Sequence, residues 1–145
     1  MTPERERLIR DSWAQFRPHA AGAARFFYDR LFELDPGSQR LFATTDMSLQ
    51  RVKLMQMLEE IVAVLDTPDL LVGPVAALGR RHATYGVQDG DYEPVGAALL
   101  WTLEETLGPA FTPEVRDAWS EAYLLLATVM RRAAARASQG QPQQP

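Results

Sequence analysis

The chain contains two histidines and no cysteine, and this limits the chemistry that its side chains can perform. Without thiolates, a structural zinc site lacks its usual ligands, and cysteine nucleophiles, disulfides and thioether-linked cofactors are excluded. The sequence also has no glycine-rich phosphate loop and no nucleophile elbow. The pairs Glu59–Glu60 and Glu104–Glu105 lie in predicted helices, where adjacent side chains point in different directions, so we interpret both pairs as solvated.

His82 is the stronger candidate for a functional residue. It ends an apolar stripe in which Leu71, Val75 and Leu78 precede it at helical spacing. A polar imidazole on such a stripe must find a partner, which is either a hydrogen bond within the core or a metal ion. His19 lies in a predicted corner with no carboxylate within one helical turn, so we interpret it as a solvated surface residue.

A single histidine suffices for one kind of metal centre, a haem iron. The porphyrin then supplies four nitrogens, and the protein supplies one axial imidazole. Such a protein also needs a wide apolar slot between helices and a few polar groups over the iron. The stripe itself leaves both interpretations of His82 open, a satisfied core histidine and an axial ligand.

The composition is that of an acidic single domain. The chain has 145 residues, of which 46% are hydrophobic and 23% charged, and its formal net charge is −4. These values are typical of a folded globular protein. An acidic chain without a basic run is a poor candidate for binding nucleic acid or an anionic membrane. No apolar run is long enough to span a bilayer and the N-terminus is polar, unlike a signal peptide, so we expect a cytoplasmic protein.

Proline and capping residues divide the chain into helices, and no alternating Val/Ile-rich stretch predicts a strand. Thr2–Pro3, Asp46 and Thr112–Pro113 predict helix starts. We expect one helix from 3 to a break at 18, and a second that includes 24–32 and ends at a corner at 35–38. Further helices are expected at 47–65, between 68 and 85, at 91–107, and from 113 onward. The fold class is therefore all-α, with 1–137 forming one domain and the polar segment 138–145 a disordered tail.

The order and spacing of several segments resemble the globin family, in particular the single-domain bacterial haemoglobins related to the globin domain of flavohaemoglobins. The resemblance covers residues 4–132, and the segments that carry it are 26–32 with 35–36 and 41–42, 48–55, 78–87 (Leu-Gly-Arg-Arg-His-Ala-Thr-Tyr-Gly-Val), 91–96 and 118–123. It implies a globin fold, in which six to eight helices form a helix-on-helix sandwich around a pocket for non-covalently bound haem b.

The resemblance also implies roles for individual residues. His82 matches the proximal iron ligand, and Gln50 and Tyr28 match distal residues that face the sixth coordination position; Tyr28 could instead be a core residue. Leu54, one helical turn after Gln50, would lie on the same face and crowd a bound gas. Lys53 and Arg81 would reach the haem propionates or remain solvated. The implied contacts with the cofactor are Phe42, Lys53, Leu78, Arg81, Val87, Tyr92 and Val95.

Two departures from the flavohaemoglobin pattern bear on activity. In those proteins the proximal histidine pairs with a tyrosine, matched here by Tyr92, and with a glutamate, whose position falls on Ala134. A carboxylate partner makes an imidazole more electron-donating, so its loss argues against peroxidase-like chemistry. The 145 residues also leave no room for a reductase domain, and steady turnover would need an external reductase.

The primary prediction is reversible, high-affinity binding of O2, for transport or storage, with CO and NO as further ligands. The amide of Gln50 and the hydroxyl of Tyr28 are both donors for a gas ligand with partial negative charge. The alternative is a nitric oxide dioxygenase that depends on an external reductase. A third interpretation, a regulatory module with a globin fold and no haem, is opposed by His82. The oligomeric state, monomer or dimer, is left open.

Overall fold

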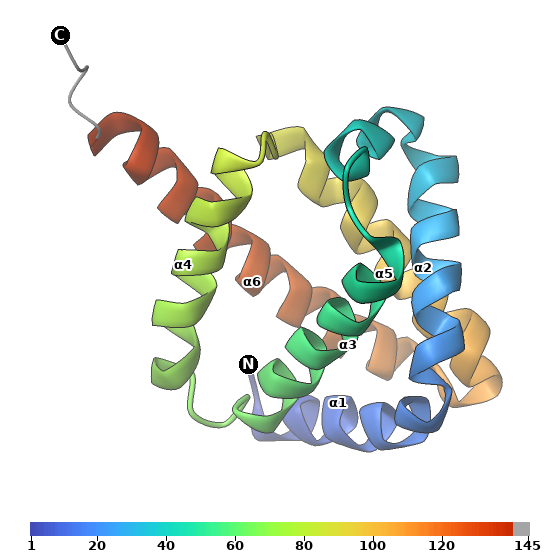
Figure 1. Ribbon diagram of the computed structural model, residues 1–145. Helices are drawn as coiled ribbons and strands as arrows, with labels where there is room; N and C mark the ends of the chain where they lie inside the picture. Colours follow the sequence, from blue (N-terminus) through green and yellow to red (C-terminus); the bar gives the residue numbers. More distant parts are fainter. Residues whose placement is uncertain (141–145) are drawn as a thin grey trace, which may run out of the picture.

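The computed structural model describes residues 1–140, and the regular elements in that range are all helical, which confirms the predicted all-α class. Figure 1 shows their arrangement. The α-helices are α1 (Pro3–Phe16), α2 (Ala20–Leu34), α3 (Met47–Ala63), α4 (Asp69–Thr84), α5 (Tyr92–Leu107) and α6 (Pro113–Gly140), and the 3-10 turns are η1 (Arg17–His19), η2 (Pro36–Phe42), η3 (Asp89–Asp91) and η4 (Gly108–Ala110). Within residues 1–140, no helix combines the length and apolar content needed to cross a bilayer.

Side-chain caps fix the predicted helix starts. The Thr2 hydroxyl accepts a hydrogen bond from the backbone N–H of Arg5 at 3.2 Å at the start of α1. At the start of α3, the Asp46 carboxylate accepts from the N–H groups of Ser48 at 3.0 Å and Leu49 at 3.3 Å. These bonds satisfy N–H groups that have no partner within the helix, so the helices begin where the capping residues stand.

Two helix ends differ from the sequence prediction. α3 ends at Ala63, two residues early, because the N–H of Val64 bonds to the Ile61 carbonyl at 3.2 Å and the N–H of Thr67 to the Val64 carbonyl at 3.0 Å, which winds the chain into tight turns. α6 continues through Gly140, beyond the expected end at 137. The rest of the expected tail, 141–145, lies outside the described residues.

α6 is the packing partner of two other helices, one from the start and one from the middle of the chain (Figure 1). α1 and α4 both pack on α6, while α2 packs on α5 and α3. Trp13 of α1 and Trp119 of α6 are buried with their rings 6.2 Å apart, and the indole Nε1 of Trp119 donates to the Ser12 hydroxyl at 2.9 Å. α4, in contrast, has α6 as its principal support.

The buried apolar side chains form two clusters. The larger lies among α1, α2, α3, α5 and the first half of α6, and includes Ile9, Trp13, Phe16, Phe27, Leu31, Leu58, Leu99, Leu103 and Trp119. The smaller joins α4, the start of α5 and the second half of α6, and consists of Val75, Tyr92, Ala127 and Met130. Among the described residues, Tyr123 packs against both. A single domain usually has one contiguous core with smaller satellite clusters, so the smaller cluster is a satellite of the main core on the α4 side of the fold.

Candidate functional site

His82 lies in the last turn of α4, with its side chain half-buried. Its Nδ1 donates a hydrogen bond to the backbone carbonyl of Leu78, one turn earlier, at 2.9 Å. This bond places the proton on Nδ1 and leaves the lone pair of Nε2 free for a metal ion. Burial lowers the pKa of His82; the bond to Leu78 opposes this shift, and the charge of Arg81 adds to it. The imidazole is therefore neutral at pH 7, which is the form that binds metals.

Tyr28, Gln50 and Phe42 come from three elements and meet at one place. The Tyr28 side chain, in α2, is 5% exposed, and Nε2 of Gln50 in α3 donates to its hydroxyl at 3.2 Å. The ring of Phe42, in η2, packs edge-on against Tyr28 with the centroids 5.5 Å apart. Burial raises the pKa of Tyr28, and its bond from Gln50 and the charge of Arg51 oppose the shift without reversing it. The hydroxyl therefore keeps its own proton, which it can donate to a ligand.

Five of the predicted side chains are apolar and half-buried, and they divide between the two core clusters. Phe42, Leu54 and Val95 pack against the larger cluster, whereas Leu78 and Val87 pack against the smaller one. α3, which carries Gln50 and Leu54, and α4, which carries His82, stand apart in Figure 1 and contact each other little. A flat apolar group between the clusters would cover these side chains and complete both. Together with the free Nε2 of His82, this arrangement fits a haem.

The remaining predicted residues lie around this region in different environments. Lys53 and Arg81 are exposed, and neither forms a salt bridge with the part of the chain that the structure describes. Tyr92 is buried at the start of α5, and the guanidinium carbon of Arg131 lies 5.1 Å from the centre of its ring. Ala134 is half-buried on α6. The matched tyrosine therefore has an arginine from α6 against its ring.

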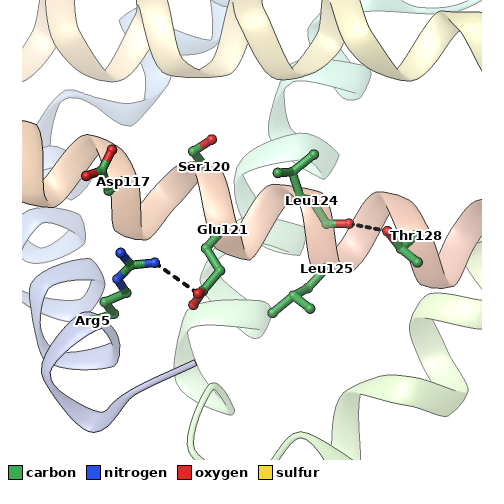
Figure 2. A pocket seen from close by; sticks show the side chains of 7 residues that line it. All are labelled: Arg5, Asp117, Ser120, Glu121, Leu124, Leu125 and Thr128. Atoms are coloured by element: carbon green, nitrogen blue, oxygen red, sulfur yellow. Dashed lines mark hydrogen bonds and ion pairs between the residues drawn. The ribbon is translucent and has the colours of Figure 1, made fainter.

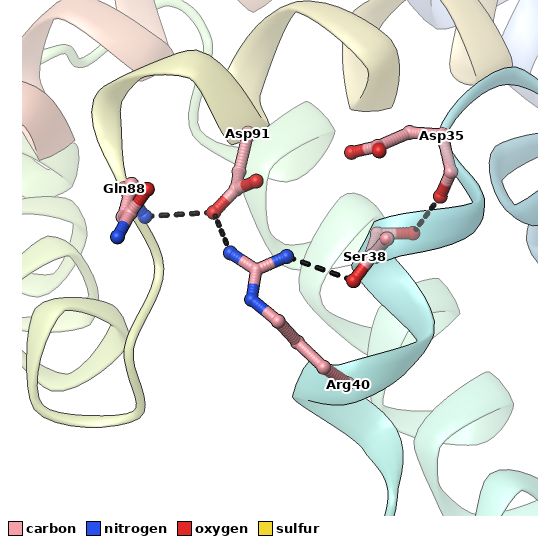
Figure 3. A network of polar contacts seen from close by, with 6 residues as sticks. Asp35, Ser38, Arg40, Gln88 and Asp91 are labelled. Carbon is pink, nitrogen blue, oxygen red and sulfur yellow. Dashed lines mark hydrogen bonds and ion pairs between the residues drawn. The ribbon is translucent and has the colours of Figure 1, made fainter.

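Figure 3 shows a polar network that the sequence did not predict. Nη2 of Arg40 lies 3.2 Å from Oδ2 of Asp91, and the same carboxylate oxygen accepts from the N–H of Gln88 at 2.7 Å. Nη1 of Arg40 donates to the Gly37 carbonyl at 2.8 Å. The network ties η2, which carries Phe42, to the turn that follows α4. Arg40 and Asp91 are 51 positions apart, so no local pattern could have paired them.

Two surface pockets contain none of the predicted site residues. The pocket drawn in Figure 2 has a volume of about 390 Å³, and the Arg5–Glu121 ion pair, at 2.9 Å, links its α1 and α6 sides. A second pocket of about 540 Å³ lies between α2 and α5 and includes His19, which is exposed as expected. Within residues 1–140, no group of three or more His, Cys, Asp or Glu side chains could hold a metal ion. The region around His82 is therefore the candidate site.

Comparison with known proteins gives the family. The globin family model matches residues 25–130. The chain belongs to the globin family. Among curated relatives, a neuroglobin from Danio rerio is 33% identical over 138 residues, covering 86% of this chain and 87% of the relative. An anaerobic nitrite reductase, HBII, from Casuarina glauca is 31% identical over 137 residues, covering 84% and 85%.

Solved structures agree with the predicted globin fold. An engineered carbene transferase from Rhodothermus marinus, provisionally described as a nitric oxide dioxygenase, superposes with a TM-score of 0.86 at 27% identity, covering 97% of each chain. A hexacoordinated haem protein from an anhydrobiotic tardigrade superposes with a TM-score of 0.84; at 19% identity, over 93% of this globin and 96% of that chain, it supports the fold alone. Membership of the family makes this chain a haem-type gas-binding protein.

Proposed function

We propose that this globin binds haem b through Nε2 of His82 and binds O2 reversibly, with CO and NO as further ligands. Haem, when bound, supplies an iron with an open coordination position for a diatomic gas. The observation that carries the proposal is the pairing of a free Nε2 on α4 with the Tyr28–Gln50 hydrogen bond on the α2–α3 side. The apolar side chains between them, Leu54, Leu78 and Val95 among them, would hold the porphyrin and exclude water.

The distal residues favour a ligand with partial negative charge. Because Gln50 donates to the Tyr28 hydroxyl, the phenol proton remains for the ligand, and burial keeps that proton in place. A polarised gas such as O2 gains more from this donor than CO does. We therefore infer high O2 affinity with slow release. Lys53 and Arg81 are exposed, and neither forms a salt bridge with a carboxylate of residues 1–140. We propose that both bind the haem propionates.

The proximal residues favour gas binding over oxidative chemistry. Nδ1 of His82 donates to a neutral backbone carbonyl at 2.9 Å, and the position where flavohaemoglobins have a carboxylate carries Ala134. A neutral acceptor gives the imidazole less electron-donating character than a carboxylate would. We therefore rank O2 binding first for this chain, acting in the cytoplasm.

Nitric oxide dioxygenation is the second candidate, and the structural similarity to the Rhodothermus marinus protein favours it. The reaction combines NO and O2 to nitrate and consumes one electron, so it needs an external reductase. The two functions would use the same residues. Rapid mixing of the oxygenated protein with NO, followed by turnover with a reductase, separates them: repeated conversion to nitrate supports the enzyme, and a single conversion without recovery supports the carrier.

The first experiment is an absorption spectrum of the purified protein in the ferric and dithionite-reduced states, then with O2 and with CO. His82→Ala is compared with His19→Ala, which removes the exposed histidine. We expect a Soret band with stable O2 and CO complexes in the wild type and in His19→Ala, and loss or gross alteration of these spectra in His82→Ala. A wild-type protein that takes up no haem would refute the proposal.

A further inference from the structure

We propose that Gly79 is a positioning residue for His82, because its lack of a side chain lets α4 lie directly against the backbone of α6. The inference rests on the proposed role of His82 as the haem ligand. Gly79 is buried in α4, three positions before His82, and faces Met130 of α6.

The approach of the two helices leaves no space for a methyl group. A Cβ atom on Gly79 would overlap the carbonyl oxygen of Met130, and it would lie 2.6 Å from the Met130 Cα and 2.8 Å from its carbonyl carbon. All three are backbone atoms, so no change of rotamer relieves the overlap. Carbon atoms in contact normally lie about 3.5–4.0 Å apart. Any residue larger than glycine must therefore move α4 relative to α6 by roughly 1 Å.

Such a movement would reach the ligand, because α4 has no other strong support. Its principal packing partner is α6, and the smaller core cluster, with Val75 and Met130, lies at this contact. The imidazole of His82 is fixed to its own helix by the bond to the Leu78 carbonyl, the residue next to Gly79. When α4 moves, the imidazole therefore moves with it and cannot turn independently to keep its place.

The chain offers a matched control in another helix. Gly22 is exposed in α2, where a Cβ atom would meet nothing within 4 Å and no proline follows. Gly79→Ala and Gly22→Ala therefore each add one methyl group to a helix, and only the first forces α4 from α6. In ferrous protein, we expect Gly79→Ala to shift the iron–histidine stretching band in resonance Raman spectra. It should also speed haem loss to an excess of apomyoglobin by about tenfold or more, the size of effect seen for groups that orient metal ligands. Gly22→Ala should match the wild type in both.

A second experiment, in a variant without the His82 side chain, distinguishes an effect of Gly79 on the position of His82 from an effect on the packing of the whole protein. In His82→Gly protein supplied with free imidazole, the axial ligand is no longer attached to α4. If Gly79 acts through His82, adding Gly79→Ala to this background should leave the iron–imidazole band and the haem loss rate as they are in His82→Gly alone. If Gly79→Ala alone fails to fold with haem, recovery of haem binding by the double variant with imidazole supports the proposal.

Three results would overturn the proposal. The first is a Gly79→Ala protein that matches Gly22→Ala in both measurements, and the second is an effect of Gly79→Ala that persists in the His82→Gly background. The third is a double variant that fails to bind haem with imidazole while His82→Gly binds it. These results differ from failure of the proposed function, in which the wild type and Gly22→Ala would themselves bind no haem.

Discussion

Replacing Tyr28 with phenylalanine removes one hydroxyl and leaves the packing of the ring in place. The ring lies 4.9 Å from Phe27, 5.5 Å from Phe42 and 6.2 Å from Phe32, measured between centroids. These contacts involve no hydroxyl, so the phenylalanine ring should occupy the same space. Gln50 loses its acceptor, but its side chain is half-exposed and can bond to water. The substitution should therefore alter gas binding with a small effect on stability.

The size of the effect follows from the bond that is lost. A hydrogen bond to a partly charged acceptor is worth about 1.5–3 kcal/mol. Since about 1.4 kcal/mol corresponds to a tenfold change in an equilibrium constant, O2 should leave the Tyr28→Phe protein about 10- to 100-fold faster. CO is less polarised than O2, so its release should change by a smaller factor. Gln50→Leu in the Tyr28→Phe background should add less than it does alone, because the two donors are coupled.

Stopped-flow displacement of O2 by CO measures the release rate directly. Tyr85→Phe is the matched control, because Tyr85 is 69% exposed at the end of α4 and takes part in none of the aromatic ring pairs among residues 1–140. Equal O2 release from Tyr28→Phe and wild type would remove the tyrosine from the binding argument, whatever the effect on CO. An equal change for O2 and CO would show that the substitution acts by altering the shape of the pocket.

Four other substitutions test the packing and the polar contacts. Gly96→Ala should destabilise the protein by about 1–3 kcal/mol in thermal or denaturant unfolding, because a Cβ atom would lie 2.6 Å from a tyrosine ring of α6. Asp91→Ala should cost more stability than Arg40→Ala. Both remove the ion pair, in which the Arg40 side chain is 49% exposed, and Asp91→Ala also removes the acceptor of the Gln88 N–H; equal losses would contradict this. Glu59→Gln should flatten the acid limb of the stability–pH curve. Hydrogen bonds from Arg17 and Trp13 lower the pKa of Glu59 in the folded protein. The Glu59 carboxylate therefore stabilises the fold fully above the ordinary glutamate pKa of about 4.3, and this stabilisation is lost as the pH falls through the lower pKa of the folded state.

The helical framework could be predicted because its signals are local. Thr2 and Asp46 stand at the helix starts that their capping bonds create, and Pro113 opens α6 as expected. The two interpretations of His82 from the sequence also prove compatible. Its Nδ1 finds a partner within its own helix, at Leu78, as a core histidine would, and this bond leaves Nε2 free for the proposed metal ligation.

Contacts between distant elements could not be predicted in the same way. Arg40 and Asp91 lie on separate turns, and exposed arginines and aspartates elsewhere in the sequence look the same as these two. Arg131 lies against the Tyr92 ring because α6 crosses the start of α5, a geometry that depends on the packing of the whole fold. The cytoplasmic location, the oligomeric state and the roles of Lys53 and Arg81 stay predictions.

The surroundings of His82 show why residue types alone would misjudge what holds its imidazole in place. A search for partners of His82 looks for a carboxylate, and Ala134 offers none. In the structure, the support of His82 comes instead from two backbone contacts: the Leu78 carbonyl, which orients the ring, and the Met130 backbone, against which Gly79 rests. Backbone groups carry no ionisable charge, so such support sets the position of the imidazole and adds little to its basicity. We therefore propose that this globin holds His82 firmly and favours reversible gas binding over oxidative chemistry, and the residues that indicate this in the sequence are Gly79 and Ala134.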